Sequence, residues 1–230
     1  MSLPRVLCLI LVVLTQLALW DNWDMISLLL VDDQTLVRQA LASLLSLEDD
    51  LKVLGQADSN QAALQRMHAL HHSGQAVDVA LVDIEMGTDS GLDLTHEIKQ
   101  VFPDTKVLIV TTFGRPGYLS RALAAGASGF IVKDTPADQL VSIIRNIYAG
   151  AKHIDPKLAA DALAQGPNPL TPREIETLSC ALTGASIEQI ATTVFLAPGT
   201  VRNIISGAMT KLGAKSRIEA AQTASAAGWL

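Results

Sequence analysis

The sequence predicts a doubly wound parallel α/β sheet followed by a small all-helical domain. Short apolar runs alternate with amphipathic stretches from residue 27 onward, which is typical of a parallel sheet with helices on both faces. Glycine and proline then gather between residues 150 and 169, which indicates a linker. Helix-start motifs follow without a further strand pattern, so the last part of the chain is expected to be helical.

The first unit, residues 25–149, shows five strand patterns that alternate with five helix patterns. This alternation predicts a five-stranded, flavodoxin-like sheet. The strands are expected at Ser27–Val31, Lys52–Gln56, Val77–Val82, Lys106–Thr111 and Gly129–Val132. The helices are expected at Thr35–Leu45, Asn60–His71, Leu92–Gln100, Tyr118–Ala125 and Pro136–Tyr148.

The linker is expected over residues 150–167, with a short helix at Leu158–Leu163. The second unit, residues 168–230, opens with a helix start: Thr171 is a good N-cap, Pro172 suits the first helical position, and Glu174 completes a capping box.

Three more helices follow in the second unit. Ser186 can cap a short helix that ends near Val194, the turn 196–200 leads to a helix over Gly199–Leu212, and Ser216 opens the last one. Two helices joined by a tight turn predict a helix-turn-helix.

Composition excludes several classes of protein. The chain is 49% hydrophobic, 17% charged and carries a net charge of −6, which excludes a disordered chain. Residues 168–230 carry five Lys and Arg against four Asp and Glu, so this segment is not a strongly basic nucleic-acid binder. Neither the two cysteines, Cys8 and Cys180, nor the five histidines show metal-ligand spacing.

The first 24 residues form an apolar extension. The run from Val6 to Trp20 is shorter than the stretch of about 20 apolar residues that spans a bilayer. Met25 then begins a pattern typical of the first strand of a domain, so we expect residues 1–24 to come from a mis-assigned start. A membrane or interaction segment and an export signal remain alternatives. We expect a cytoplasmic protein without membrane contact through residues 6–20.

Polar residues follow the predicted strands at one edge of the sheet. Asp32 and Asp33 follow the first strand, Asp83 the third, Thr111 ends the fourth, and Lys133 follows the fifth. The carboxyl ends of parallel strands meet at one edge, so these side chains are expected to converge. Three carboxylates repel one another unless a hard cation neutralises them, and an oxygen-only site suits Mg²⁺.

One carboxylate of such a cluster can attack a phosphoryl group and hold it as an aspartyl phosphate. Asp83 is the candidate because it follows the strand expected at the centre of the sheet. Lys133 would pair with one phosphoryl oxygen, and the Thr111 hydroxyl would donate to another.

The acidic pair Asp32-Asp33, together with Asp83, Thr111 and Lys133, matches the motif of a known family. On these residues, the segment 25–149 resembles the receiver domain of two-component response regulators. The resemblance implies that Asp83 takes its phosphoryl group from a sensor histidine kinase. It also implies that Thr111 and Phe130 form a switch, and that Mg²⁺ is held by Asp32, Asp33, Asp83 and the backbone of Glu85. The sequence departs from the family at Gly87, where proline is usual; this predicts a looser loop over Glu85–Ser90.

Residues 168–230 resemble the LuxR-type helix-turn-helix of the NarL/FixJ family. The resemblance is carried by Leu170–Glu174, Ile187, Ile190-Ala191, Gly199–Asn203, Lys211–Gly213 and Arg217. In this arrangement the helix Gly199–Leu212 would lie in the major groove. Arg202, Asn203 and Ser206 would face the bases, whereas Thr200, Lys211 and Arg217 suit phosphate contacts.

Within this family, the runs Thr111–Tyr118, Thr200–Asn203 and Arg217–Ala220 look like those of the regulators of membrane-lipid desaturase genes, which implies a lipid- or envelope-linked regulon.

The sequence thus predicts a non-enzymatic, phosphorylation-dependent transcription regulator. It would dimerise on phosphorylation and bind double-stranded promoter DNA. One alternative is a phosphohydrolase with Asp83 as nucleophile and Glu85, two residues on, as a second acid. Another is a membrane-tethered adaptor that uses residues 6–20.

Overall fold

The structure is a computed structural model that describes residues 25–87, 89–112 and 114–230. The expected N-terminal extension, residues 1–24, lies outside the described residues. Among the helices of the described ranges, none is both long enough and apolar enough to cross a membrane.

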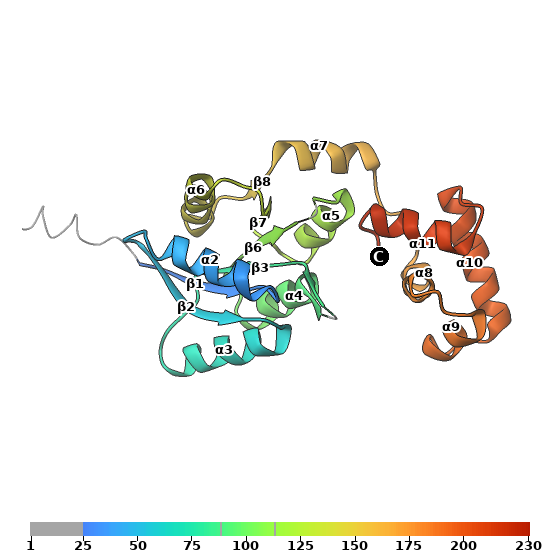
Figure 1. The fold of residues 1–230 in the computed structure, drawn as a ribbon, viewed down its shortest axis with the longest axis horizontal. Coiled ribbons are helices and arrows are strands. Elements are labelled where there is room, and N and C mark those ends of the chain that lie inside the picture. Colours follow the sequence, from blue (N-terminus) through green and yellow to red (C-terminus); the bar gives the residue numbers. More distant parts are fainter. Residues whose placement is uncertain (1–24, 88, 113) are drawn as a thin grey trace, which may run out of the picture.

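The first unit is built on a parallel sheet with strand order β2-β1-β3-β6-β7-β8 (Figure 1). All its strand pairs are parallel. The five expected strands are present, and β3 lies between β1 and β6 in the interior of the sheet. Their bounds are β1 Ile26–Val31, β2 Leu51–Ala57, β3 Val79–Val82, β6 Lys106–Thr111 and β7 Gly129–Val132.

A sixth strand corrects the expectation of a five-stranded sheet. β8, His153–Ile154, pairs with β7 inside the segment expected to be linker. A strand of two residues is too short to show a period of two, so no pattern marked it. A Cβ at Gly129 would lie 2.6 Å from Ile147 Cδ1 and 3.1 Å from the His153 carbonyl oxygen, so a side chain at this position would crowd both.

Helices cover both faces of the sheet, as expected for a doubly wound fold. Adjacent strand residues point to opposite faces, so Leu29 joins the core beneath α3, α4 and α5, whereas Leu28 joins the core beneath α2 and α6. The bounds are α2 Thr35–Leu45, α3 Asn60–His72, α4 Gly91–Val101, α5 Pro116–Ala124 and α6 Ala137–Tyr148.

The loop after Asp83 is an antiparallel hairpin rather than the looser loop expected. β4, Glu85–Met86, pairs with β5, Asp89–Ser90. Gly87 adopts φ +61° in the turn, a left-handed conformation that glycine reaches without steric penalty. A glycine in place of the usual proline therefore permits a tight turn.

The linker contains a longer helix than expected, α7, Pro156–Gln165. Asp155 caps it by accepting hydrogen bonds from the Lys157 and Leu158 backbone N–H groups. Leu158 is buried in the same core as α5. The linker helix therefore packs on the first unit and is not an isolated helix in solvent.

Four helices form the second unit: α8 Pro172–Leu182, α9 Ile187–Thr193, α10 Pro198–Leu212 and α11 Arg217–Ala226. The capping box of Thr171 and Glu174 is present, and Ser186 forms a second one with Gln189. Leu178, Ile190, Val201 and alanines of α11 share one core. The expected helix-turn-helix is thus formed by α9 and α10.

Candidate functional site

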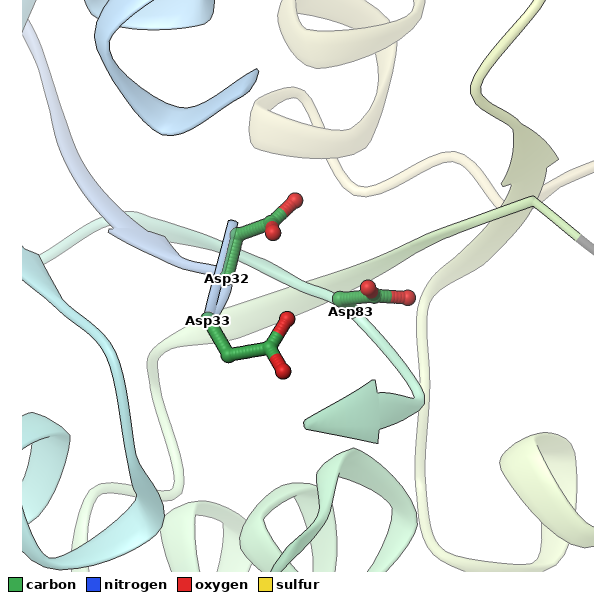
Figure 2. A group of neighbouring side chains, drawn as sticks. All are labelled: Asp32, Asp33 and Asp83. Atoms are coloured by element: carbon green, nitrogen blue, oxygen red, sulfur yellow. The ribbon is translucent and has the colours of Figure 1, made fainter. Parts of the chain in front are cut away.

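The structure brings together the three expected aspartates at the carboxyl edge of the sheet (Figure 2). One carboxylate oxygen of each of Asp32, Asp33 and Asp83 lies within 4.8 Å of those of the other two. Asp32 and Asp83 are buried, while Asp33 is exposed. The cluster consists only of oxygen ligands and opens toward solvent at Asp33, which suits a hard cation that keeps part of its water shell.

Lys133 lies between the two buried carboxylates. Its Nζ is 2.6 Å from Asp32 Oδ2 and 2.8 Å from Asp83 Oδ2. Lys133 directly follows β7, and its backbone N–H donates to the Thr111 carbonyl at 2.8 Å, so pairing between β6 and β7 fixes its position. Two buried carboxylates side by side repel each other, and the positive charge of Lys133 offsets this repulsion.

Burial and charge act in opposite directions on these groups. Burial raises the pKa of Asp83 above its ordinary value, although the hydrogen bond and charge of Lys133 oppose the shift. Burial lowers the pKa of Lys133, but its hydrogen bonds to Asp32 and Asp83 outweigh burial, so this pKa is raised overall. Lys133 is therefore a cation at neutral pH, when an incoming anion would meet it.

Backbone groups fix the buried carboxylates. The Ile84 backbone N–H donates to Asp83 Oδ1 at 2.7 Å, and the Gln34 N–H donates to Asp32 Oδ1 at 2.8 Å. Arg38 donates to the Asp32 carbonyl oxygen. These bonds hold the two side chains in place before any ligand binds.

The expected switch residues are both in the interior. Thr111, at the end of β6, and Phe130, in β7, have no exposed surface. Phe130 packs in the core shared with α4 and α5. Both expected switch residues are therefore part of the packed interior of the receiver.

Glu85 turns its carboxylate toward α5, not into the aspartate cluster. Its Oε1 accepts a hydrogen bond from the Tyr118 hydroxyl at 2.8 Å and lies 3.4 Å from Arg115 Nη1. Sequence reasoning missed Arg115 and Tyr118 as neighbours of this edge. Their positions follow from α5 packing, for which the sequence shows only an amphipathic helix.

In the second unit, α10 presents the expected polar face. Thr200, Arg202, Asn203 and Ser206 are all exposed, whereas Val201 on the opposite face is buried. Thr200 lies in the first turn of the helix. This face combines side chains that can donate to and accept from base edges and phosphates.

The two other residues expected at phosphates differ in their surroundings. Lys211 Nζ lies 2.7 Å from Glu174 Oε2, so this ammonium already has an ion-pair partner within its own domain. Arg217 begins α11 and is half-buried. Arg202 is only loosely paired, at 3.5 Å from Glu188, and both side chains are more than 60% exposed. Of the cations expected at DNA, Arg202 is the most available to an external anion.

Comparisons with known proteins match both units. The family model described as the response regulator receiver domain matches residues 28–145. The model described as bacterial regulatory proteins of the luxR family matches residues 168–224. The matched ranges lie within the two units expected from the sequence.

Two relatives from Bacillus subtilis (strain 168) align with nearly all of the chain. The uncharacterized transcriptional regulatory protein YvfU is 41% identical over 206 residues, which cover 90% of this chain and 100% of YvfU. The transcriptional regulatory protein DesR is 38% identical over 205 residues, covering 89% of this chain and 99% of DesR. The chain is thus similar to transcriptional regulators over both units.

Solved structures agree with this assignment. The response regulator ChrA of a heme-sensing two-component system is 28% identical, with a TM-score of 0.52, over 90% of this chain and 100% of its own. RcsB of Salmonella typhimurium has a TM-score of 0.63 over 89% of this chain and 98% of its own; at 21% identity it shows likeness of fold. The family expected from the sequence is confirmed, and the chain belongs to the response regulators that join a receiver domain to a LuxR-type DNA-binding domain.

Proposed function

We propose that phosphorylation of Asp83 controls dimerisation and promoter binding by this transcriptional regulator. The observation that carries the proposal is the position of Asp83. It is buried at the end of an interior strand, with Asp32 and Asp33 on one side and the Lys133 ammonium 2.8 Å away. The proposal takes residues 25–149 as the receiver, 150–167 as the linker and 168–230 as the DNA-binding domain.

The phosphoryl transfer follows from the charges at this edge. An oxygen of Asp83 attacks the phosphorus of a phosphohistidine on a sensor kinase, the bond from phosphorus to the donor nitrogen breaks, and the nitrogen keeps that electron pair. Lys133 then pairs with a phosphoryl oxygen, and the Thr111 hydroxyl donates to another. Lys133 already contacts Asp83, so a small movement would bring it to the new anion.

The aspartate cluster fits a magnesium ion. Its ligands are oxygens only, two carboxylates are fixed by backbone N–H groups, and the third faces solvent. Asp32, Asp33, Asp83 and the backbone of Glu85 would hold Mg²⁺, which neutralises the negative charge that gathers when a phosphoryl group approaches.

The DNA-binding half of the proposal rests on α10. Its exposed face carries Thr200, Arg202, Asn203 and Ser206, and the family is one of transcriptional regulators. With five cations against four acidic residues, one copy of the domain should bind DNA only weakly. We therefore propose that two copies bind neighbouring half-sites of promoter DNA. A protein that binds promoter DNA in this way would act in the cytoplasm.

The phosphohydrolase alternative has less support. That chemistry needs a second acid beside the nucleophile, and the Glu85 carboxylate instead contacts Tyr118 and Arg115. The adaptor alternative relies on residues 6–20, which lie outside the described residues, and the lipid-linked regulon stays a prediction.

The test uses the full chain with acetyl phosphate and Mg²⁺. Wild type should gain the mass of one phosphoryl group and sediment as a dimer, and Asp83→Asn should do neither. Asp104→Asn makes the same substitution at an exposed position and should behave as wild type. Loss of modification in both variants, or in neither, would contradict the proposal.

A further inference from the structure

The helix-turn-helix carries one acidic side chain next to its recognition helix. Between residues 187 and 212, which span α9 and α10, Glu188 is the one Asp or Glu of the sequence. It lies in the first turn of α9, and its side chain is 67% exposed. Its Oε1 lies 3.5 Å from Nη2 of Arg202, on the exposed face of α10. A carboxylate thus contacts the arginine that is expected to face the bases.

The packing of the two helices fixes the backbone from which this pair extends. Ile190 of α9 and Val201 of α10 belong to one buried core (Figure 1). Ile190 comes two residues after Glu188, and Val201 directly precedes Arg202. A capping box over residues 186–189 also fixes the start of α9. The two charged side chains therefore start from well-defined positions on neighbouring helices.

Glu188 is an anion at neutral pH. Hydrogen bonds from its own backbone N–H and from the Ser186 side chain hold the pKa of Glu188 below its ordinary value, and the charges of Arg202 and Arg217 act in the same direction. Arg217, at the start of α11, is another cation expected at DNA. Glu188 is therefore a negative charge close enough to two expected DNA contacts to be affected by both.

A negative charge at this place opposes contact with the DNA backbone. In a helix-turn-helix the first helix crosses the phosphate backbone, while the second lies in the major groove. Phosphates on the side of α9 would approach the part of the Arg202 guanidinium that Glu188 already contacts. Two anions would then compete for one cation and repel each other. Contacts to phosphate supply nearly all the affinity for DNA of the wrong sequence, so Glu188 should weaken that binding.

The ion pair leaves Arg202 able to read a base. A guanidinium has five N–H donors in a planar fork, and the contact with Glu188 is made by Nη2. The donors of Nε and Nη1 therefore remain for a second acceptor. In the major groove guanine presents O6 and N7, which an arginine can bind through two N–H groups. Arg202 can thus bind guanine without leaving Glu188.

The ion pair adds little to the stability of the fold. Both side chains are more than 60% exposed, and water and salt screen pairs of this kind. Two other acidic residues of the domain, Glu174 and Glu219, accept backbone N–H groups at helix starts and so support the fold directly. The effect of Glu188 should therefore appear in DNA binding and not in unfolding.

We propose that Glu188 is a specificity-determining residue of the DNA-binding domain. It holds Arg202 where the guanidinium can bind a guanine, and its charge disfavours phosphate contacts by the same arginine. Discrimination then comes from weaker binding to DNA of the wrong sequence, and not from tighter binding to the right one. This inference deepens the proposed function and rests on it, because it takes α10 as the recognition helix.

The test measures DNA binding by the full chain, with and without acetyl phosphate and Mg²⁺. Wild type first selects a duplex from a random pool, and a duplex with the same bases in scrambled order serves as nonspecific DNA. The specificity ratio is the Kd for the scrambled duplex divided by the Kd for the selected one. Glu188→Gln removes the charge but keeps the size of the side chain. Glu176→Gln is the matched control, because it removes an exposed carboxylate that pairs with Arg173 on α8.

Glu188→Gln should lower the specificity ratio about fivefold. The scrambled duplex should bind about fivefold more tightly, with a salt slope that is steeper by about one phosphate contact. Affinity for the selected duplex should change by less than about twofold, because a weaker hold on Arg202 offsets the smaller repulsion of phosphates. Glu176→Gln changes the net charge by the same amount and should keep the ratio of wild type.

Arg202→Ala shows whether Glu188 acts through this arginine. In the Arg202→Ala background, Glu188→Gln should leave the affinity for the scrambled duplex unchanged, because no guanidinium remains to turn toward a phosphate. Low salt keeps this nonspecific binding measurable. An equal gain in both backgrounds would mean that the carboxylate repels DNA by its charge alone, which would overturn the proposal. Urea unfolding of Glu188→Gln should match wild type, so that a changed ratio does not reflect a damaged fold.

The outcomes separate the role of Glu188 from the function on which it rests. If wild type prefers the selected duplex and Glu188→Gln keeps its ratio, the role of Glu188 is overturned and the proposed function stands. The same holds if Glu176→Gln lowers the ratio equally. If wild type prefers no duplex over another, DNA recognition by α10 is overturned, and the role of Glu188 falls with it. A failure of Asp83 phosphorylation alone leaves the comparison of the variants intact.

Discussion

The Lys211 ammonium lies 2.7 Å from Glu174 Oε2, which ties the end of α10 to the start of α8. The same Glu174 oxygen accepts the Thr171 backbone N–H at 2.7 Å, so one carboxylate closes a capping box and a salt bridge. Burial raises the pKa of Glu174, but its bonds to Lys211 and Thr171 outweigh burial and lower it overall. Lys211, which is expected at DNA phosphates, thus also forms an ion pair that joins two helices of its own domain.

Lys211→Met should therefore lower the free energy of unfolding, while it should change the affinity for DNA little. Glu174 is largely buried, and losing its cation should lower the free energy of unfolding by about 1 kcal/mol in urea denaturation. Lys215→Met, at an exposed position, should change little. A salt dependence of DNA binding that falls by about one unit of slope, with stability unchanged, would instead make Lys211 a phosphate contact.

Mg²⁺ should stabilise the folded protein through the aspartate cluster. An ion that binds only the folded state at ten times its Kd adds about 1.4 kcal/mol, which thermal unfolding with and without EDTA can measure. Asp33→Asn removes the exposed ligand without disturbing the Lys133 bridges, so it should reduce the gain. Asp104→Asn should keep it. An equal gain in both variants would place the ion elsewhere.

The acidic edge was predictable because each of its residues follows an apolar strand, and parallel strands end together. Asp32, Asp83 and Lys133 accordingly lie where the strand pattern puts them. The partners of Glu85 and Lys211 were not predictable. Glu85 and Tyr118 are 33 positions apart, and Lys211 and Glu174 are 37 apart. No local period records such contacts, because tertiary packing alone brings these residues together.

Arg145 should stabilise the receiver in a pH-dependent way. It binds Asp50 through two hydrogen bonds of 2.7 and 2.8 Å, and the bond to Arg145 holds the pKa of Asp50 below its ordinary value. The stabilisation is therefore complete above the ordinary Asp pKa of about 3.9 and is lost as the pH falls through the lowered pKa.

Urea unfolding of Arg145→Met should show this dependence. The variant should be less stable than wild type by about 1 kcal/mol at pH 7, a figure kept small because Arg145 is 40% exposed. The difference should shrink between pH 4 and pH 2, and Arg66→Met should show no such trend. A difference that stays constant over this range would mean that Arg145 acts through packing of its aliphatic part.

Phe195 should be replaceable with a gain in stability. It lies in the turn between α9 and α10 with φ +55° and is 92% exposed, so its ring gains little from burial while its backbone holds a conformation that disfavours bulky side chains. Asparagine tolerates this conformation, so Phe195→Asn should raise the free energy of unfolding by about 1 kcal/mol. Phe195→Leu keeps the steric conflict and should give no gain. If both variants lose stability in urea denaturation, the ring contributes to packing in the turn, and the strain is not what limits this position.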